Sequence, residues 1–293
     1  MSQLHNTHGK TARRAQVERF SPVPLPASPG LARQIARSLL PPLLLGIIIV
    51  AVYAFVRSGL PAHRQFLMPS AEGLWSQAFG IAAFRQELME RALTTISIAV
   101  SGLAVSIPVG ILLGIVMFRF YALERAVFPY LVALQSIPIM AVIPLIQSAL
   151  GFGFLPKVLI VALFTFFAIP TTLLLGLKSL DRNILDLFRL QNAGWWIMLR
   201  KAGLPSAAPT LFAGLRISGS LAVIAAIVSE LFFLSGKGGL GQLLMNAKID
   251  FKYEQMYAAL IIASALSIAV YLLFNWLGNR LFAHWHESSE RQR

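Results

Sequence analysis

Long apolar stretches recur along this chain, and each is bounded by charged or turn-forming residues. A helix needs about 20 apolar residues to cross the hydrocarbon of a bilayer. The pattern therefore predicts an all-α polytopic membrane protein with about six transmembrane helices in a domain over residues 38–281. The stretches of sufficient length are residues 38–56, 92–117, 127–150, 157–177, 208–234 and 256–281.

The two ends of the chain differ from this domain. Residues 1–37 are rich in Arg, Ser and Pro, which predicts a flexible basic tail near anionic lipid. Residues 282–293 are expected to form a second tail. The first apolar stretch is expected to be retained, because no small-x-small cleavage site follows it. In the longest outer segment, residues 57–91, "LMPSAEGLWSQAF" predicts a turn and then an amphipathic helix at the interface.

Composition agrees with the membrane interpretation. The chain is 57% hydrophobic and 13% charged, with a mean hydropathy of +0.70, whereas soluble domains carry about a quarter charged residues. Its net charge is +13, but no soluble module gathers the basic residues, so no nucleic-acid partner is expected. Sixteen of the 25 Lys and Arg lie on the side of the termini, which predicts cytoplasmic termini. Cysteine is absent, which excludes disulfides and thiolate chemistry.

Helix breakers and polar groups gather in the third apolar stretch, which contains Pro129, Pro138 and Pro144. Two interpretations remain open for it: a kinked helix that lines a pathway, and a buried helix whose amides bond to its neighbours. The candidate pathway residues, taken over all stretches, are Gln135, Ser136, Pro138, Gln147, Arg216 and Glu230.

The fifth apolar stretch carries two charged residues. Glu230 is the only acidic residue well inside a stretch, and intramembrane carboxylates are costly and often functional. Since it lies about one turn from the outer end, where a carboxylate reaches water, we expect an outer-gate or helix-packing role in preference to a proton relay. Arg216 lies near the inner end and is expected to extend its head group to the interface. In the second stretch, Gly110 and Gly114 predict close helix approach.

The segment "SGKGGLGQ", residues 235–242, contains a G-x-G-x-x-G spacing at Gly236, Gly238 and Gly241. A dinucleotide fold needs a strand before such glycines, and a phosphate loop needs Ser or Thr after the Lys. Here a membrane helix precedes them and Gly238 follows Lys237, so we predict a flexible outer turn. The five histidines lie near the ends or in an outer loop. No catalytic, metal or cofactor site is expected in this chain.

The loop 178–206 is expected to be cytoplasmic and structured. Its "KSLDRNILDLFRLQNAGWWIMLRKAGLP" interleaves apolar and charged residues. Two short amphipathic helices are predicted around Asn192-Ala193-Gly194, because Asn and Gly tolerate the left-handed conformation between helices. Leu204-Pro205 is expected to stop the second helix. Its exposed aromatic residues need a cover, either lipid or a partner protein.

This loop resembles the signature E-A-A-x3-G-x9-I-x-L-P of inner-membrane permeases of binding-protein-dependent ATP-binding-cassette (ABC) importers. Anchored on Leu204-Pro205, the Glu falls on Asp186, the two Ala on Leu187 and Phe188, the Gly on Asn192 and the Ile on Ala202. The match departs from the signature in a shorter acid, two bulky residues and the Asn. The ATPase-coupling residues that the resemblance implies are Asp186, Leu187, Phe188, Asn192, Gly194, Trp195, Arg200, Leu204 and Pro205.

Other segments extend the resemblance over about residues 65–280. "LMPSAEGLW", "LQSIPIMAVIPLIQSALGFGFLPK", "LPSAAPTLFAGLRIS", "SELFF" and "GGLGQLL" follow the order and spacing of the permease subfamily that handles nitrate, aliphatic sulfonates, taurine and thiamine-precursor pyrimidines. The resemblance implies a permease similar to those of type I ABC importers, in the bacterial inner membrane.

The resemblance also implies partners: a second copy of the permease, two cytoplasmic ATPase subunits and an extracytoplasmic substrate-binding protein. The chain has no G-x4-G-K-[ST], so ATP and Mg²⁺ are expected on the ATPase partner. A small anion such as a sulfonate, taurine or nitrate and a pyrimidine thiamine precursor both fit as cargo. The alternatives are an ion- or proton-coupled secondary transporter, which would want ionisable groups near the midplane, and an intramembrane enzyme, which would want an acid–base or metal set.

Overall fold

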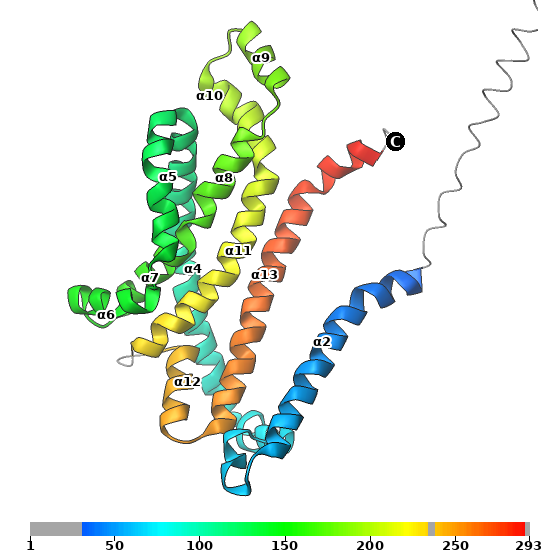
Figure 1. Ribbon diagram of the computed structural model, residues 1–293, viewed down its shortest axis with the longest axis vertical. Coiled ribbons are helices and arrows are strands. Elements are labelled where there is room, and N and C mark those ends of the chain that lie inside the picture. The colour runs from blue at the N-terminus through cyan, green and yellow to red at the C-terminus, as the bar shows by residue number, and fades with distance from the viewer. Residues whose placement is uncertain (1–30, 234–237, 291–293) are drawn as a thin grey trace, which may run out of the picture. The chain divides into compact units, whose positions relative to one another are not determined.

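The computed structural model describes residues 31–233 and 238–290 (Figure 1), and all regular elements of this part are helical. The chain divides into two units, residues 1–65 and 66–293. Residues 1–30, which are most of the expected basic tail, lie outside the described residues, as do Gly236 and Lys237.

The described part of the first unit contains one long helix, α2 (Leu31–Gly59), which covers the expected first span, and the unit ends within the 3₁₀ turn η1 (Ala62–Leu67). The helix starts directly after Pro29-Gly30 and runs through residues 31–37, which we had assigned to the tail. No Pro or Gly interrupts those residues, so nothing in the sequence stops the helix there. Within it, Leu43–Gly59 forms a shorter apolar helix whose large side chains are exposed, with Phe55 at 79%.

The second unit holds the remaining helices. They are, after the 3₁₀ turn η1 (Ala62–Leu67), α3 (Ala71–Leu74), the π turn η2 (Trp75–Phe79), α4 (Ala82–Arg119), α5 (Tyr121–Ser136), α6 (Ile139–Leu150), α7 (Phe154–Phe166), α8 (Ala168–Lys178), α9 (Arg182–Leu190), α10 (Trp195–Met198), the π turn η3 (Leu199–Gly203), α11 (Leu204–Phe232), α12 (Leu240–Ile249) and α13 (Tyr253–Glu290). Helix α13 continues through residues 282–290 of the expected second tail, where the sequence has no Pro or Gly.

Four helices of the described part are long and apolar enough to span a membrane: Ala82–Arg119, Phe154–Lys178, Trp195–Phe232 and Tyr253–Leu281. The α5–α6 pair becomes a fifth if it counts as one broken span. Of the six expected spans, four are therefore present as continuous helices that are long enough to cross a membrane.

The third expected span is not one helix. Helices α5 and α6 meet at 96°, and the break falls on Ile137 and Pro138. Proline disfavours the helical conformation of the residue before it, and Ile137 is extended at φ −72° and ψ 122°. Pro129 and Pro144 lie within α5 and α6 without ending them. The single span predicted over residues 127–150 is therefore corrected to two short helices.

Helix α11 is the centre of the second unit, where it packs against α4, α7, α8, α12 and α13. Glycines allow the closest helix approaches. A Cβ on Gly110 would lie 2.8 Å from Ile169 Cγ2, and one on Gly114 would lie 3.0 Å from Leu173 Cδ2. The predicted close approach at these two glycines is thus the contact of α4 with α8.

The second amphipathic helix of the 178–206 loop does not stop at Leu204-Pro205. Helix α10, the π turn η3 and α11 form one continuous helical segment, Trp195–Phe232. Pro205 lies in the first turn of α11, and the Leu204 N–H directly before it bonds back to the Leu199 carbonyl across the π turn, so the helix continues through the proline. The π turn before it absorbs the irregularity.

The helix predicted within residues 57–91 is present as two short pieces, α3 and η2. Ser70 caps α3 by accepting a hydrogen bond from the Gly73 N–H at 3.0 Å. The chain continues through the π turn η2, which exposes Trp75 at 68%.

Replacing Gly110 by Leu should lower the free energy of unfolding by about 1–3 kcal/mol, because the new side chain overlaps Ile169 and Pro170. The matched control is Gly46→Leu in α2, where no heavy atom lies within 4 Å of the added Cβ. Thermal unfolding in detergent measures both, and equal shifts of Tm would contradict the close packing of α4 on α8.

Candidate functional site

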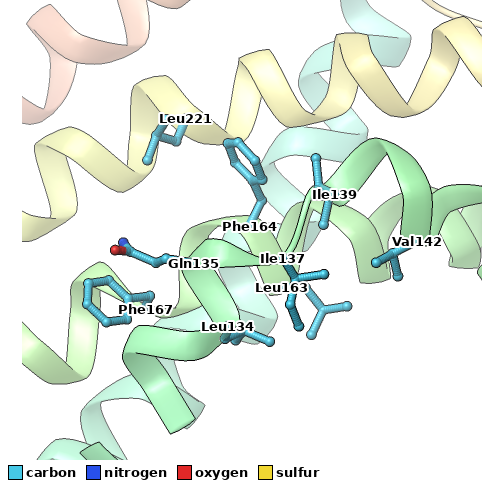
Figure 2. A pocket seen from close by; sticks show the side chains of 9 residues that line it. All are labelled: Leu134, Gln135, Ile137, Ile139, Val142, Leu163, Phe164, Phe167 and Leu221. Atoms are coloured by element: carbon cyan, nitrogen blue, oxygen red, sulfur yellow. The ribbon is translucent and has the colours of Figure 1, made fainter. Parts of the chain in front are cut away.

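A pocket of about 300 Å³ lies beside the break between α5 and α6. Helices α5, α6, α7 and α11 and the α7–α8 junction line it, and the amide of Gln135 is the polar side chain among apolar ones (Figure 2). Two phenylalanine rings contribute aromatic surface. The lining residues are Leu134, Gln135, Ile137, Ile139, Val142, Leu163, Phe164, Phe167 and Leu221.

The other polar residues of the broken span have different surroundings. Gln147 of α6 donates from Nε2 to the Phe232 carbonyl at 2.9 Å, and so ties α6 to the end of α11. Ser136 bonds back to the Val132 carbonyl of its own helix at 3.5 Å. Gln135 thus faces a pocket, whereas the Gln147 amide is bonded to a neighbouring helix. A helix buried in the bundle does not describe this stretch, because α5 and α6 bury only Leu131 and Ile143.

Arg216 is separate from this pocket. Its Nη1 donates to Asn275 Oδ1 at 2.7 Å, which joins α11 to α13. The side chain is partly buried. The guanidinium therefore bonds to a neighbouring helix, whereas the sequence predicted only that it extends to the membrane interface.

Glu230 is completely buried, contrary to the expectation that it reaches water. Its Oε2 accepts hydrogen bonds from Thr95 Oγ1 at 3.0 Å and from the Gly241 N–H at 2.9 Å. Thr95 Oγ1 in turn accepts from the Leu240 N–H at 2.9 Å. The first N–H groups of α12 thus receive caps from α4 and α11, and a negative charge at a helix N-terminus is stabilising.

Glycine is required where α12 meets these caps. A Cβ on Gly239 would overlap the Glu230 carboxylate and the Thr95 hydroxyl, and one on Gly241 would overlap the Ile227 carbonyl. Gly238 to Gly241 are buried. This part of the predicted flexible outer turn is therefore a fixed, packed segment, because close backbone approach leaves no room for side chains.

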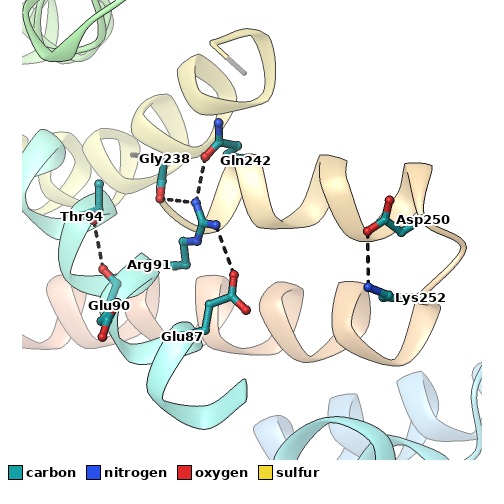
Figure 3. A network of polar contacts seen from close by, with 8 residues as sticks. All are labelled: Glu87, Glu90, Arg91, Thr94, Gly238, Gln242, Asp250 and Lys252. Carbon is teal, nitrogen blue, oxygen red and sulfur yellow. Dashed lines mark hydrogen bonds and ion pairs between the residues drawn. The ribbon is translucent and has the colours of Figure 1, made fainter. Parts of the chain in front are cut away.

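Arg91 of α4 holds the same segment through further polar contacts. Its Nη1 donates to the Gly238 carbonyl at 2.9 Å and to Gln242 Oε1 at 2.8 Å, while Nη2 pairs with Glu87 at 3.1 Å (Figure 3). We name the set Arg91, Thr95, Glu230 and Gln242 the α12 anchor.

Sequence reasoning found only Glu230 of this anchor. Thr95 is 135 residues away from Glu230, and no local pattern links them. Lys157 stands at the start of the expected fourth span, residues 157–177, and is not among the candidate residues, yet it is 3% exposed and lies in the first turn of α7. Its position inside the run "FLPKVLIVALF" was the signal that could have revealed a buried cation.

The predicted coupling loop contains two helices, α9 and α10, at the end of the second unit opposite α12 (Figure 1). Asn192 between them has φ +50°, which confirms the left-handed turn predicted at Asn192-Ala193-Gly194; Gly194 itself is extended. Asp186 pairs with Arg189 at 3.0 Å on an exposed face. Among the other predicted coupling residues, Leu187 and Arg200 are exposed. Three are half-buried, namely Phe188, Leu204 and Pro205.

No residue of α9 is buried, whereas Trp195 of α10 packs on the membrane domain. Trp195 lies against a cluster around Leu173 and Leu199, with the Arg119 guanidinium 5.5 Å from its ring centroid. Trp196 and Leu190 are exposed at 60% and 82%. The apolar surface that needs a cover is thus made by α9 and Trp196 and not by Trp195.

The family model of the binding-protein-dependent transport system inner membrane component matches residues 106–283. The chain belongs to this family. The matched range includes the broken span, the pocket, the α9–α10 segment and Glu230. This permease is therefore a transport subunit of a binding-protein-dependent ABC importer, a multi-pass protein of the bacterial inner membrane.

Two curated relatives are similar over most of their length. The riboflavin transport system permease protein RibX of Chloroflexus aurantiacus is 31% identical over 258 residues, 87% of this chain and 95% of the relative. The formylaminopyrimidine transport permease protein ThiX of Halalkalibacterium halodurans is 37% identical over 187 residues, 64% of this chain and 74% of the relative.

Two solved structures share the fold. An inward-facing structure of the MetNI methionine ABC transporter gives a TM-score of 0.52 at 22% identity, over 74% of this chain and 99% of that one. A bacterial ABC transporter involved in import of the acidic polysaccharide alginate gives 0.58 at 15% identity, over 85% and 98%. The all-helical permease architecture expected from the sequence is thereby confirmed.

Replacing Thr95 by Val should lower the free energy of unfolding by about 2 kcal/mol, because the Leu240 N–H and Glu230 Oε2 each lose a buried partner. Hydrogen exchange of residues 238–249 should become faster. Thr94→Val is the control, since the Thr94 hydroxyl bonds to Glu90 O of its own helix. Exchange that stays as slow as in the control would contradict the capping of α12 by Thr95.

Proposed function

We propose that this permease imports a planar heteroaromatic solute of the pyrimidine or flavin type through the pocket beside the α5–α6 break. The observation that carries the proposal is the pocket lining, which combines two phenylalanine rings and aliphatic side chains with one amide, Gln135. Aromatic rings stack on a flat heterocycle, and an amide both donates and accepts hydrogen bonds at its edge.

A small anion fits this lining less well. Sulfonate and nitrate recognition calls for Arg, Lys or converging N–H donors, and the nine lining residues include no cation. The names of the relatives RibX and ThiX, riboflavin and formylaminopyrimidine transport permeases, support a heteroaromatic cargo. The relative SsuC of Bacillus subtilis, named as a putative aliphatic sulfonates permease, is 26% identical over 220 residues, and its cargo class is the second candidate.

We also infer that ATP and Mg²⁺ bind to separate ATPase subunits that dock on α9 and the exposed face of α10, on the cytoplasmic side. The exposed apolar residues Leu187, Leu190 and Trp196 support this docking. So does the basic character of this end, which carries Arg182, Arg200 and Lys201. The termini would then face the cytoplasm as well.

A second copy of the chain and an extracytoplasmic binding protein complete the proposed particle. The exposed apolar surface of α5 and α6 supports a permease dimer, because Tyr130 of α5 and Leu145 of α6 are 76% and 69% exposed. In such a dimer the pocket beside the α5–α6 break would open toward the partner copy. It would then form part of a translocation pathway between the two copies.

Gln135→Leu should lower ATP-driven uptake of a radiolabelled formylaminopyrimidine about tenfold, because the cargo loses one hydrogen bond in an apolar path. Cells that carry the complete importer give the measurement, with Gln86→Leu on the exposed face of α4 as the control. Competition by riboflavin, taurine and nitrate tests the cargo class. Uptake that only taurine or nitrate inhibits would contradict the heteroaromatic assignment.

Trp196→Ala should weaken co-purification of the ATPase subunits about tenfold while the permease stays folded, because a large exposed aromatic residue is a strong anchor at an interface. Trp75→Ala serves as the control, because Trp75 lies in the segment 57–91 and is 68% exposed, against 60% for Trp196. Retention of the ATPase at the control level would show that α10 does not carry the docking surface.

A further inference from the structure

The two oxygens of the Glu230 carboxylate have unlike surroundings. Oε2 holds α12 through Thr95 and Gly241. Oε1 is buried and accepts no hydrogen bond of ordinary geometry within the described residues, although the Gly239 N–H interacts weakly with the carboxylate. An unpaired buried oxygen of a charged group is unfavourable, so Oε1 has capacity for a further strong donor.

Lys157 supplies a buried cation that interacts with this carboxylate. Its ammonium and the carboxylate attract each other electrostatically, but residues 31–233 and 238–290 contain no hydrogen bond between them. The ammonium instead lies 5.9 Å from the centroid of the Phe233 ring. A charge-assisted hydrogen bond is stronger than such a cation–π contact, and the flexible lysine stem allows Nζ to reach different partners.

Three helices meet around this cation. Phe233 directly follows α11, three residues beyond Glu230, and its ring contacts Phe152 edge-on at 6.3 Å just before α7. Gln147 of α6 bonds to the neighbouring Phe232 carbonyl at 2.9 Å. A small shift of α7 relative to α11 therefore changes which group the Lys157 ammonium faces, the ring or the carboxylate.

We propose that Lys157 and Glu230 form a direct ion pair in one state of the transport cycle and are separated in the other, which is the state of this structure. In the ion-paired state the Lys157 ammonium would bond to Glu230 Oε1, and Oε2 takes no part in the change. Because Oε2 keeps its hydrogen bonds to α4 and α12, the α12 anchor stays closed while α7 moves. Lys157 is thus a positioning residue for the outer ends of α7 and α11. The proposal requires an importer with two states but does not depend on the identity of its cargo.

A double-mutant cycle in two trapped states tests the proposal. Lys157→Met retains a long flexible stem without its charge, and Glu230→Gln retains an oxygen for Thr95 and Gly241. The complete importer, with ATPase and binding protein, is prepared with both single variants and the double variant. Thermal unfolding is measured without nucleotide and after trapping with ADP and vanadate. The non-additive part of the Tm shifts should be about 3 °C in one state and close to zero in the other.

Other outcomes overturn the proposal. Equal coupling in both states would mean a permanent ion pair, and no coupling in either state would mean that the two charges never meet. Lys248→Met, on the exposed part of α12, controls for the loss of a positive charge at this end. If Glu230→Gln does not assemble, Lys157→Met is compared with Lys157→Arg, which keeps the charge. The Tm of Lys157→Met should then be lower than that of Lys157→Arg in one of the two states only. An equal difference in Tm in both states would contradict the proposal.

Discussion

A polar backbone group in a bilayer has to find its hydrogen-bond partner inside the protein, and the second unit of this permease follows that constraint throughout. Its long helices satisfy their backbone N–H and C=O groups internally over most of their length. The break at Pro138 and the start of α12 are two of the places where the helical ladder is lost. At α12 the replacement partners come from other helices, the hydroxyl of Thr95 and the carboxylate of Glu230. Without them, a buried helix end would have no hydrogen-bond acceptors.

The two ends of the second unit differ in how much of their surface is buried within the chain. At the α12 end, the anchor around Glu230 and Arg91 is formed within one chain. At the other end, α9 has no buried residue and presents Leu187 and Leu190 to the surroundings. A surface of that kind is stable only when something covers it. The architecture therefore joins an end that is held together by hydrogen bonds within one chain to an end that exposes apolar side chains.

The sequence was sufficient for the features that depend on local pattern. Apolar length gave four continuous spans, and Asn192 marked the left-handed turn between α9 and α10. It was not sufficient where distant residues decide. Three prolines lie in the third stretch, but only Pro138 breaks the helix. The burial of Glu230 depends on Thr95, in a helix far away in sequence, and the pocket depends on the angle between α5 and α6. Such contacts arise from packing, and no periodicity encodes them.

The continuity of Trp195–Phe232 has a mechanical consequence. At 1.5 Å per residue, its 38 residues form a rod of about 57 Å with the proposed docking surface at one end and the Glu230 carboxylate near the other. A tilt of about 5° around the docking end would displace the far end by about 5 Å, larger than the length of a hydrogen bond. Since Pro205 does not interrupt the rod, the geometry itself amplifies a small rotation into a displacement sufficient to exchange the partners of a buried charge.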